Sequence, residues 1–291
     1  MRIHHLNCGT FCPVGGPLMD GRSRGATGRL VCHCLLLETD RGLVLVDTGL
    51  GLRDMQQPFP RLSRLYATLL NIRFDPEQSA VRQIERLGFA ARDVRHIVLT
   101  HLDFDHAGGL DDFPVAIVHL LDAEAAAALR QRRGFVAQRR YRPQQWGDSS
   151  RWRRYRPQGE PWYGFDSVRE LDGLPPDILL VPLIGHSLGH AGVAIRTEAG
   201  WLLNAGDAYF YRDEVGLHAY HCPTGLRAYQ RLMEARRPDR LRNQERLREL
   251  AAARVDDVRI MCSHDPVLFD AMSSAPLARQ VAPPRDVVLS A

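Results

Sequence analysis

The sequence contains no lysine, because all 38 of its basic residues are arginine. This absence excludes the usual P-loop nucleotide hydrolases and protein kinases, which need a lysine to bind phosphate. It also excludes enzymes that form a Schiff base or hold pyridoxal phosphate through a lysine amine. We attribute the missing lysine to genomic base composition rather than to function.

Other features are absent as well. The chain has no run of about 18 uncharged apolar residues, so we expect no membrane span. Residues 1–5 lack the apolar stretch that opens a secretory signal. The six cysteines match no four-ligand zinc pattern, and a chain of 291 residues does not need disulfide bonds for stability. We therefore expect a cytoplasmic protein. The net charge of +4 is too small to indicate nucleic-acid binding.

The remaining composition is that of a globular protein, with 45% apolar and 25% charged residues. Short apolar runs that end at glycine or aspartate predict buried strands. These strands are expected at residues 31–39, 43–46, 96–100, 115–118, 178–181 and 258–261, with a hairpin at 193–195 and 201–203. Helices are predicted from the N-cap Asp75 to Gly88, after Asp122, and over about 225–254. The order of the elements indicates an α/β (α+β) protein. The expected architecture is a four-layer αββα sandwich, in which two mixed β-sheets pack face to face with helices outside.

We expect one domain over residues 1–291, because no linker divides the chain. Residues 130–165 are expected to be irregular, and they are dense in arginine and aromatic residues. This insertion is either a lid that offers aromatic walls and a guanidinium to an anionic substrate group, or a solvated arginine-rich surface. Residues 272–291 are expected to form a tail on the surface.

The strongest motif is HLDFDHAGG at residues 101–109, directly after a predicted strand. Imidazoles and carboxylates at this density suit zinc, iron or manganese. The alternative is a polar strand-to-helix turn in which Asp105 serves as an N-cap. Three later segments also place an imidazole or a carboxylate after a strand: GHSLGH at 185–190, GDA at 206–208 and SHD at 263–265. Together these segments indicate a metal site.

This ordered set, with DTG at residues 47–49, resembles the metallo-β-lactamase-fold metallohydrolases. Residues 101–109 are most similar to the N-acyl-homoserine lactone lactonases. The resemblance implies two divalent metal ions, the first held by His101, the residue at position 103 and His186. It places the second ion at Asp105, His106 and His264, and a bridging carboxylate at Asp207. Asp47 and His190 are expected to brace these ligands.

The chain departs from the lactonase pattern at position 103, where Asp103 stands in place of a histidine. If Asp103 binds metal, its carboxylate favours iron or manganese over zinc compared with an all-histidine site. The alternative is that Asp103 does not reach the metal, and that the first site is weak or empty. An acidic residue at this position also occurs in the flavodiiron branch, which keeps a diiron oxidoreductase open as a competing function.

The expected chemistry is hydrolysis of an ester carbonyl, most plausibly in a lactone or a related small acyl ester. A hydroxide that bridges both ions at Asp207 would attack the carbonyl, and Asp105 would pass a proton to the leaving group. The lactonases carry a tyrosine three residues after the bridging aspartate. Here that position is Phe210, between Tyr209 and Tyr211, and either tyrosine could replace it. His218 and His221 follow closely and are expected near the substrate.

Three other functions stay open at this point. The same fold could hydrolyse a thioester or a phosphodiester, the carboxylate at position 103 could belong to a diiron oxidoreductase, or the protein could bind a ligand without catalysis. The expected partner is a small-molecule acyl substrate, and we expect neither a membrane nor nucleic acid. A homodimer is left open.

Overall fold

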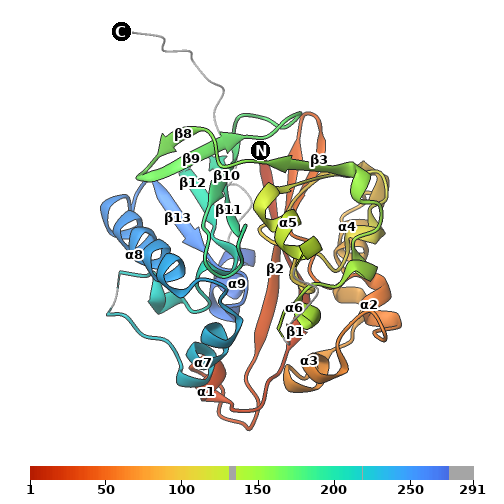
Figure 1. The fold of residues 1–291 in the computed structure, drawn as a ribbon, viewed down its shortest axis with the longest axis vertical. Helices are drawn as coiled ribbons and strands as arrows, with labels where there is room; N and C mark the ends of the chain where they lie inside the picture. Colours follow the sequence, from red (N-terminus) through yellow and green to blue (C-terminus); the bar gives the residue numbers. More distant parts are fainter. Residues whose placement is uncertain (131–135, 218, 275–291) are drawn as a thin grey trace.

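The computed structural model describes residues 1–130, 136–217 and 219–274, and its strands form two mixed β-sheets (Figure 1). The seven-stranded sheet contains β1 (Arg2–Phe11), β2 (Leu30–Thr39), β3 (Gly42–Val46), β4 (Ile72–Arg73), β5 (Val94–Val98), β6 (Ile117–Leu121) and β7 (Trp152–Tyr155), in the order β4-β1-β2-β3-β5-β6-β7. The six-stranded sheet contains β8 (Glu160–Trp162), β9 (Phe165–Glu170), β10 (Ile178–Pro182), β11 (Ala191–Thr197), β12 (Gly200–Asn204) and β13 (Val258–Met261), in the order β13-β12-β11-β10-β9-β8.

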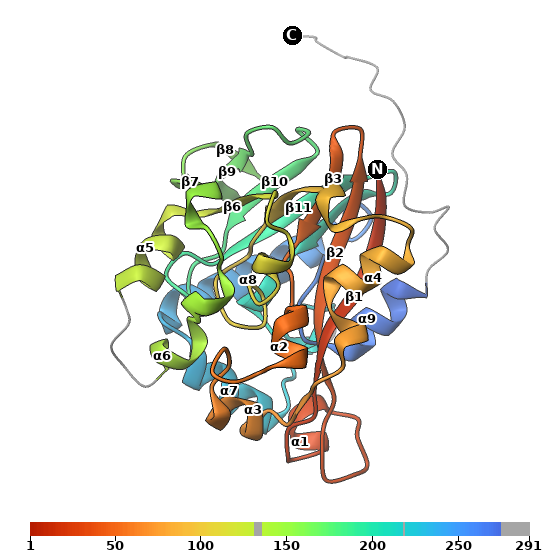
Figure 2. The same ribbon diagram turned by 90° about the vertical axis from the view of Figure 1, so that its right-hand side faces the viewer.

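Helices cover both outer faces of the sheets. They are α1 (Pro17–Asp20), α2 (Leu52–Gln56), α3 (Arg64–Leu69), α4 (Ala80–Arg86), α5 (Asp122–Arg130), α6 (Ala137–Arg140), α7 (Thr224–Met233), α8 (Arg237–Ala253) and α9 (Pro266–Ser273). In Figure 1, α8 lies to the left of the two sheets and α4 and α5 lie to the right. In both views, α1, α3 and α7 gather at the lower end of the molecule (Figure 2).

The main core lies between the sheets. Alternate residues of β2 and β3, such as Leu35, Leu37 and Val44, pack there against the apolar side chains of β10 and β11. The opposite face of the same sheet packs on α4 and α5, and α8 packs on the outer face of the six-stranded sheet. This arrangement confirms the predicted αββα sandwich.

The predicted elements differ from the structure in several places. The helix expected from Asp75 to Gly88 is divided, because Asp75 caps a short 3₁₀ turn and α4 begins only after Ser79. The helical region 225–254 breaks at residues 234–236 into α7 and α8. The irregular structure expected over 130–165 is wrong where β7 and β8 form. β7 is an edge strand of the seven-stranded sheet, and β8 is an edge strand of the six-stranded sheet. Residues 131–135 and most of the expected tail lie outside the described residues.

The fold brings the carboxyl ends of β3, β5, β10, β12 and β13 to one side, where the two sheets are joined by hydrogen bonds. The N–H of Ala191, at the start of β11, donates to the carbonyl of Thr100, which follows β5, at 2.9 Å. The N–H of His33 in β2 donates to the carbonyl of Ser263 after β13, also at 2.9 Å. The loops after these strands are therefore held against one another. Among the described residues, no helix has the length and apolar character needed to span a membrane.

Candidate metal centre

Residues 101–106 form a tight loop after β5, and the loop that follows β3 clamps it in place. The N–H and the hydroxyl of Thr48 both donate to the carbonyl of His106, at 2.8 and 2.9 Å. Gly108 lies so close to Gly49 that a Cβ atom on Gly108 would stand 2.6 Å from the Gly49 carbonyl oxygen. Glycine at 108 therefore allows the close approach that positions the loop.

Asp47 holds the base of this loop. Its Oδ1 accepts a hydrogen bond from the N–H of Thr100 at 2.8 Å, and its Oδ2 accepts one from the Thr100 hydroxyl at the same distance. Oδ2 also lies 2.8 Å from Nδ1 of His106. The backbone of Asp47 has a φ of 55°, a left-handed conformation that costs about 1–2 kcal/mol for a residue with a Cβ atom. The three hydrogen bonds offset that cost.

Asp207, which follows β12, lies at the centre of the candidate ligands. Its Oδ1 is 3.1 Å from Nε2 of His264 and 3.3 Å from Nε2 of His106. Oδ2 of Asp105 lies 3.7 Å from the same His264 nitrogen. Asp105, His106, Asp207 and His264 thus form one half of the cluster.

The other half lies on the opposite oxygen of Asp207. Oδ2 of Asp207 is 3.4 Å from Nε2 of His186 and 3.7 Å from Nε2 of His101. Oδ2 of Asp103 is 3.1 Å from the His186 nitrogen. The structure therefore brings together every ligand residue that the sequence predicted: His101, Asp103, Asp105, His106, His186, Asp207 and His264.

Three polar atoms in this cluster are buried without a hydrogen-bond partner among the described residues. They are Nε2 of His101, Nε2 of His106 and Oδ1 of Asp207. Leaving such an atom unpaired costs about 1–3 kcal/mol. A cation that accepts all three lone pairs removes that cost, and imidazole with carboxylate is a donor set suited to zinc, iron or manganese. The cluster therefore fits a metal ion.

The electrostatics of the metal-free cluster differ from residue to residue. The carboxylate of Asp207 outweighs burial and raises the pKa of His106 and of His264, so both imidazoles must lose a proton to bind a metal ion. Asp207 and His101 already have the protonation states that bind metal. Burial disfavours a charge on Asp207, yet the imidazoles of His264 and His106 outweigh it and hold the pKa of that carboxyl well below its usual range. Burial lowers the pKa of His101 well below that of a free histidine. At neutral pH, Asp207 is therefore an anion and His101 is neutral.

An arginine from α6 enters the cluster at Asp103. Nε of Arg140 donates to Oδ1 of Asp103 at 2.6 Å, and Nη2 donates to Oδ2 at 2.7 Å. Nη2 also lies 2.7 Å from Nε2 of His186. Burial disfavours the Asp103 anion, but this guanidinium outweighs it and lowers the pKa of Asp103 well below its usual range. The sequence analysis did not single out Arg140, because it stands among many arginines and no spacing connects it to residue 103.

Glu124, in the first turn of α5, is a second residue that the sequence analysis missed. Its Oε1 accepts a hydrogen bond from the N–H of Leu102 at 3.0 Å. Its Oε2 accepts from the Ser187 hydroxyl at 2.5 Å and from the N–H of Gly189 at 3.1 Å. One fully buried carboxylate thus joins the loop that carries His101 to the loop that carries His186.

Two other ligand loops are held by histidine rings. Nε2 of His190 accepts a hydrogen bond from the N–H of Asp207 at 2.9 Å, while its Nδ1 lies 3.0 Å from the Leu183 carbonyl. Nδ1 of His264 lies 2.8 Å from the carbonyl of Val31 in β2. In both rings one nitrogen is fixed by the backbone, which orients the other.

Of the described residues expected to contact substrate, Phe210 lies at the cluster, and the others lie elsewhere. The ring of Phe210 lies against the cluster, with its centroid 5.1 Å from that of His264. The structure brings neither Tyr209 nor Tyr211 to the ligands. Tyr209 is buried among the apolar side chains beneath α8, and the hydroxyl of Tyr211 accepts a hydrogen bond from Arg212 at 2.7 Å. His221 is exposed, and His218 lies outside the described residues.

A tyrosine other than Tyr209 and Tyr211 packs on Phe210, namely Tyr229 on α7. Its ring centroid is 6.1 Å from that of Phe210. Burial raises the pKa of Tyr229 well above that of a free tyrosine, and the nearby carboxylate of Asp105 adds to the effect. Its phenol is therefore neutral at neutral pH and can donate a hydrogen bond.

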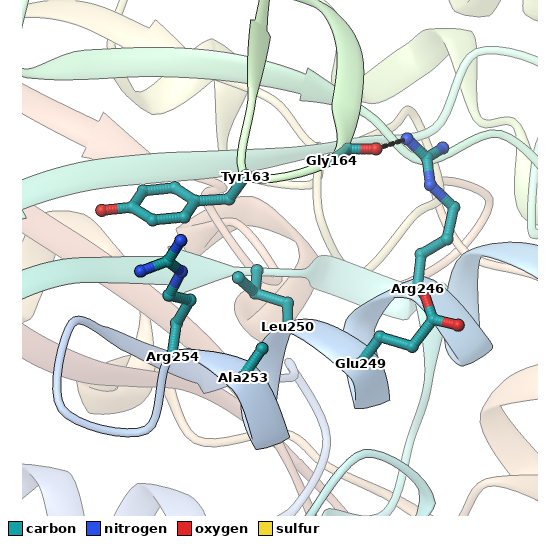
Figure 3. A pocket seen from close by; sticks show the side chains of 7 residues that line it. All are labelled: Tyr163, Gly164, Arg246, Glu249, Leu250, Ala253 and Arg254. Atoms are coloured by element: carbon teal, nitrogen blue, oxygen red, sulfur yellow. Dashed lines mark hydrogen bonds between the residues drawn. The ribbon is translucent and has the colours of Figure 1, made fainter.

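A separate surface pocket of about 260 Å³ lies between the β8–β9 turn and α8 (Figure 3). Figure 3 shows Tyr163 and Arg254 on one side of it, and Arg246 reaching the carbonyl of Gly164 on the other. None of the residues that line this pocket belongs to the ligand cluster. The pocket is therefore not part of the metal centre.

Comparisons with known proteins agree with this geometry. Residues 27–264 match the profile of the Metallo-beta-lactamase superfamily. A probable metallo-hydrolase of Mycobacterium tuberculosis is 41% identical over 274 residues, which cover 92% of this chain and 82% of that protein. An N-acyl homoserine lactonase of Bacillus cereus is 26% identical over 235 residues, which cover 77% of this chain and 86% of that one.

Solved structures show the same fold. An N-acyl homoserine lactone hydrolase, with the product N-hexanoyl-L-homoserine bound at its catalytic metal center, superposes with a TM-score of 0.68. The two chains are 21% identical, and the superposition covers 93% of this chain and 95% of the other. A probable metal-dependent hydrolase from Staphylococcus aureus gives a TM-score of 0.65 at 18% identity, covering 90% of this chain and 88% of that one. The resemblance expected from residues 101–109 is thereby confirmed.

Proposed function

Because the chain belongs to the metallo-beta-lactamase superfamily, we propose that its buried cluster is the active site of a metal-dependent hydrolase that cleaves a carboxylic ester, with lactones as the first substrate class. One observation carries this proposal. The nitrogens of His101 and His106 and the oxygen of Asp207 lie in one buried cluster and lack hydrogen-bond partners in the part of the chain that the structure describes. The similarity to lactonases supports the choice of substrate class.

Asp105, His106, Asp207 and His264 would hold the metal ion. When bound, a divalent ion polarises a carbonyl oxygen and lowers the pKa of a coordinated water. The protein fixes its own groups around that position, since Asp47 orients the ring of His106 and Val31 orients the ring of His264.

Asp105 is the ligand residue placed to move a proton. Its exposure of 8% is the highest in the cluster, and so its carboxylate lies at the mouth of the site. From there it can hand a proton to the leaving alkoxide of an opened ester. Tyr229, whose ring packs on Phe210, stays protonated and can donate a hydrogen bond to a substrate oxygen.

The surroundings of the cluster favour an acyl group. Phe210 packs on His264, and Phe11 also lies near this ring, with a centroid distance of 6.3 Å. Phe104 packs against Phe11 at 6.3 Å and against Tyr66 at 6.2 Å. This aromatic wall offers apolar contact to an acyl chain rather than charge to a phosphodiester.

The first of the two ions that the resemblance implies would occupy His101, Asp103 and His186. These residues are grouped closely enough to hold a cation. Two of them already contact the guanidinium of Arg140, at 2.6 and 2.7 Å. A metal ion would therefore meet a bound guanidinium in this half of the cluster, whereas the half with Asp105, His106 and His264 has no such contact with Arg140.

The test is a hydrolysis panel on protein that has been stripped with a chelator and reloaded with zinc, manganese or iron. We expect metal-dependent opening of N-acyl homoserine lactones and simple γ-lactones, measured by proton release. Asp207→Ala should lose metal and activity together. Turnover by metal-free protein, or turnover of only thioesters or phosphodiesters in the same panel, would contradict the proposal. Oxygen consumption by iron-loaded protein would favour the diiron alternative.

A further inference from the structure

The guanidinium of Arg140 is fully satisfied inside the cluster. Nε and Nη2 donate to the two oxygens of Asp103, and Nη2 also donates to Nε2 of His186. Nη1 donates to the carbonyl of Met233 at 2.9 Å and to the carbonyl of His186 at 3.2 Å. Every N–H group of the guanidinium therefore has an acceptor, and the residue is only 4% exposed.

These contacts occupy the lone pair on Nε2 of His186 and one of the two lone pairs on each oxygen of Asp103. Arginine has no acceptor and does not lose its proton in proteins, so Nε2 of His186 must accept the hydrogen bond from Nη2. Both oxygens of Asp103 accept in the same way. In this half of the cluster, Nε2 of His101 is buried without a hydrogen-bond partner among the described residues.

The charge of this half is also already balanced. Arg140 and Asp103 form a bidentate ion pair away from water, and breaking such a pair leaves an uncompensated buried charge. A divalent cation would additionally face a fixed positive charge in contact with two of its ligands. Beside Arg140, the backbone of Tyr141 pairs with that of Asp103, which holds the arginine in place.

We propose that the guanidinium of Arg140 takes the place of a metal ion at His101, Asp103 and His186, so that this chain binds one metal ion instead of two. The remaining ion belongs to Asp105, His106, Asp207 and His264, where the nitrogen of His106 and an oxygen of Asp207 lack partners among the described residues. The inference rests on the proposed metal-dependent function and adds to it the number of ions. It competes directly with the two-ion site that the lactonase resemblance implies.

The test counts metal ions and does not use activity. Wild-type protein is stripped of metal, loaded with excess zinc and desalted. Its zinc is then measured by elemental mass spectrometry, and its concentration by amino-acid analysis. We expect one zinc ion per chain. Arg140→Ala should gain a second ion, and Arg153→Ala, which removes an exposed arginine of β7, should stay at one.

Arg140→Ala leaves Asp103 unpaired and can prevent folding. We therefore add Asp103→His combined with Arg140→Ala, which removes both members of the ion pair and restores a three-imidazole site. This double variant should hold two ions. A further measurement needs no variant, because manganese-loaded wild type should give the electron paramagnetic resonance spectrum of an isolated ion and no spin-coupled pair.

Each result bears on the inference. Wild type with one ion and a double variant with two support it. Wild type with two ions, a coupled manganese spectrum, or a folded double variant that stays at one ion overturns it. Two ions together with lactone hydrolysis overturn the inference alone. One ion without turnover of any ester supports the inference and overturns the proposed function, and no ion at all overturns both.

Discussion

Oδ2 of Asp47 lies 2.8 Å from Nδ1 of His106, and this contact determines which nitrogen of the imidazole faces the ligand cluster. A carboxylate only accepts hydrogen bonds, so Nδ1 carries a proton and Nε2 is the nitrogen that faces Asp207 and is available to a metal ion. Residues 47 and 106 belong to loops after adjacent parallel strands, β3 and β5. The sheet itself therefore sets the orientation of a metal ligand.

Asp47→Asn should weaken metal binding by about 10–100-fold, the usual effect of losing a carboxylate behind a ligand histidine. The amide keeps the size of the side chain but loses its charge. The measurement is competition for zinc against a chelator of known affinity. Asp40→Asn, at an exposed hairpin position, is the matched control and should leave the affinity unchanged. Equal affinities for both variants would show that Asp47 does not act on the metal.

Glu124→Ala should destabilise the fold by about 2–5 kcal/mol, since it leaves several buried donors without an acceptor. These donors are the N–H groups of Leu102 and Gly189 and the hydroxyl of Ser187. Urea unfolding of metal-free protein measures the change. Glu85→Ala removes a carboxylate from an exposed ion pair with Arg82 and should cost less than about 1 kcal/mol. A similar loss for the two variants would argue against the bracing role.

Tyr229→Phe should reduce kcat for lactone opening by about tenfold or more, while the bound metal stays constant. The change removes only the hydroxyl near Asp105. Tyr163→Phe, at the exposed β8–β9 turn, serves as the control and should retain full activity. If Tyr209→Phe or Tyr211→Phe carried the loss instead, the assignment of Tyr229 would be wrong and the expectation from the sequence would stand.

Asp112 should make the stability depend on pH. It accepts a hydrogen bond from the N–H of Leu52 at 2.8 Å, and burial raises its pKa to about 7. Because its pKa is higher in the folded state than in the unfolded state, the folded protein binds this proton more tightly. The contribution of Asp112 to the free energy of unfolding is therefore greatest at low pH and falls as the pH rises from about 4 to about 7.

Asp112→Asn stays neutral and should remove this part of the slope. The measurement is urea unfolding of both metal-free proteins at several pH values between about 5 and 8. The stability of the variant relative to wild type should rise with pH over that range. A constant difference across the range would mean that Asp112 does not titrate there.

The residues of the candidate cluster could be found from the sequence because they lie in loops after buried strands, and local hydrophobic pattern indicates where such strands end. His101 and His264 are found in this way from residues 96–100 and 258–261 alone. β1 could not be found, since its inward and outward positions alternate irregularly and a register shift interrupts its pairing with β2. Local pattern carries no information on strand pairs with such a shift.

Arg140 and Glu124 escaped prediction for a different reason. Each residue contacts residues that are far away in sequence, and the residues next to it in sequence give no sign of those contacts. Glu124 reads as an acidic residue in the first turn of a helix, and Arg140 as one of many surface arginines. Only the three-dimensional structure shows that both side chains are buried against the ligand loops. The sequence showed that Asp103 replaces a histidine, but it did not show that Arg140 is the partner of Asp103.

The contact between His264 and Val31 has a consequence for biosynthesis. These residues are separated by 233 positions, yet the carbonyl of one orients the ring of the other. While the chain is still being translated, the first sheet can form without its last ligand loop. The candidate ligand cluster can therefore be completed only after β13 has emerged from the ribosome and docked, at the end of folding.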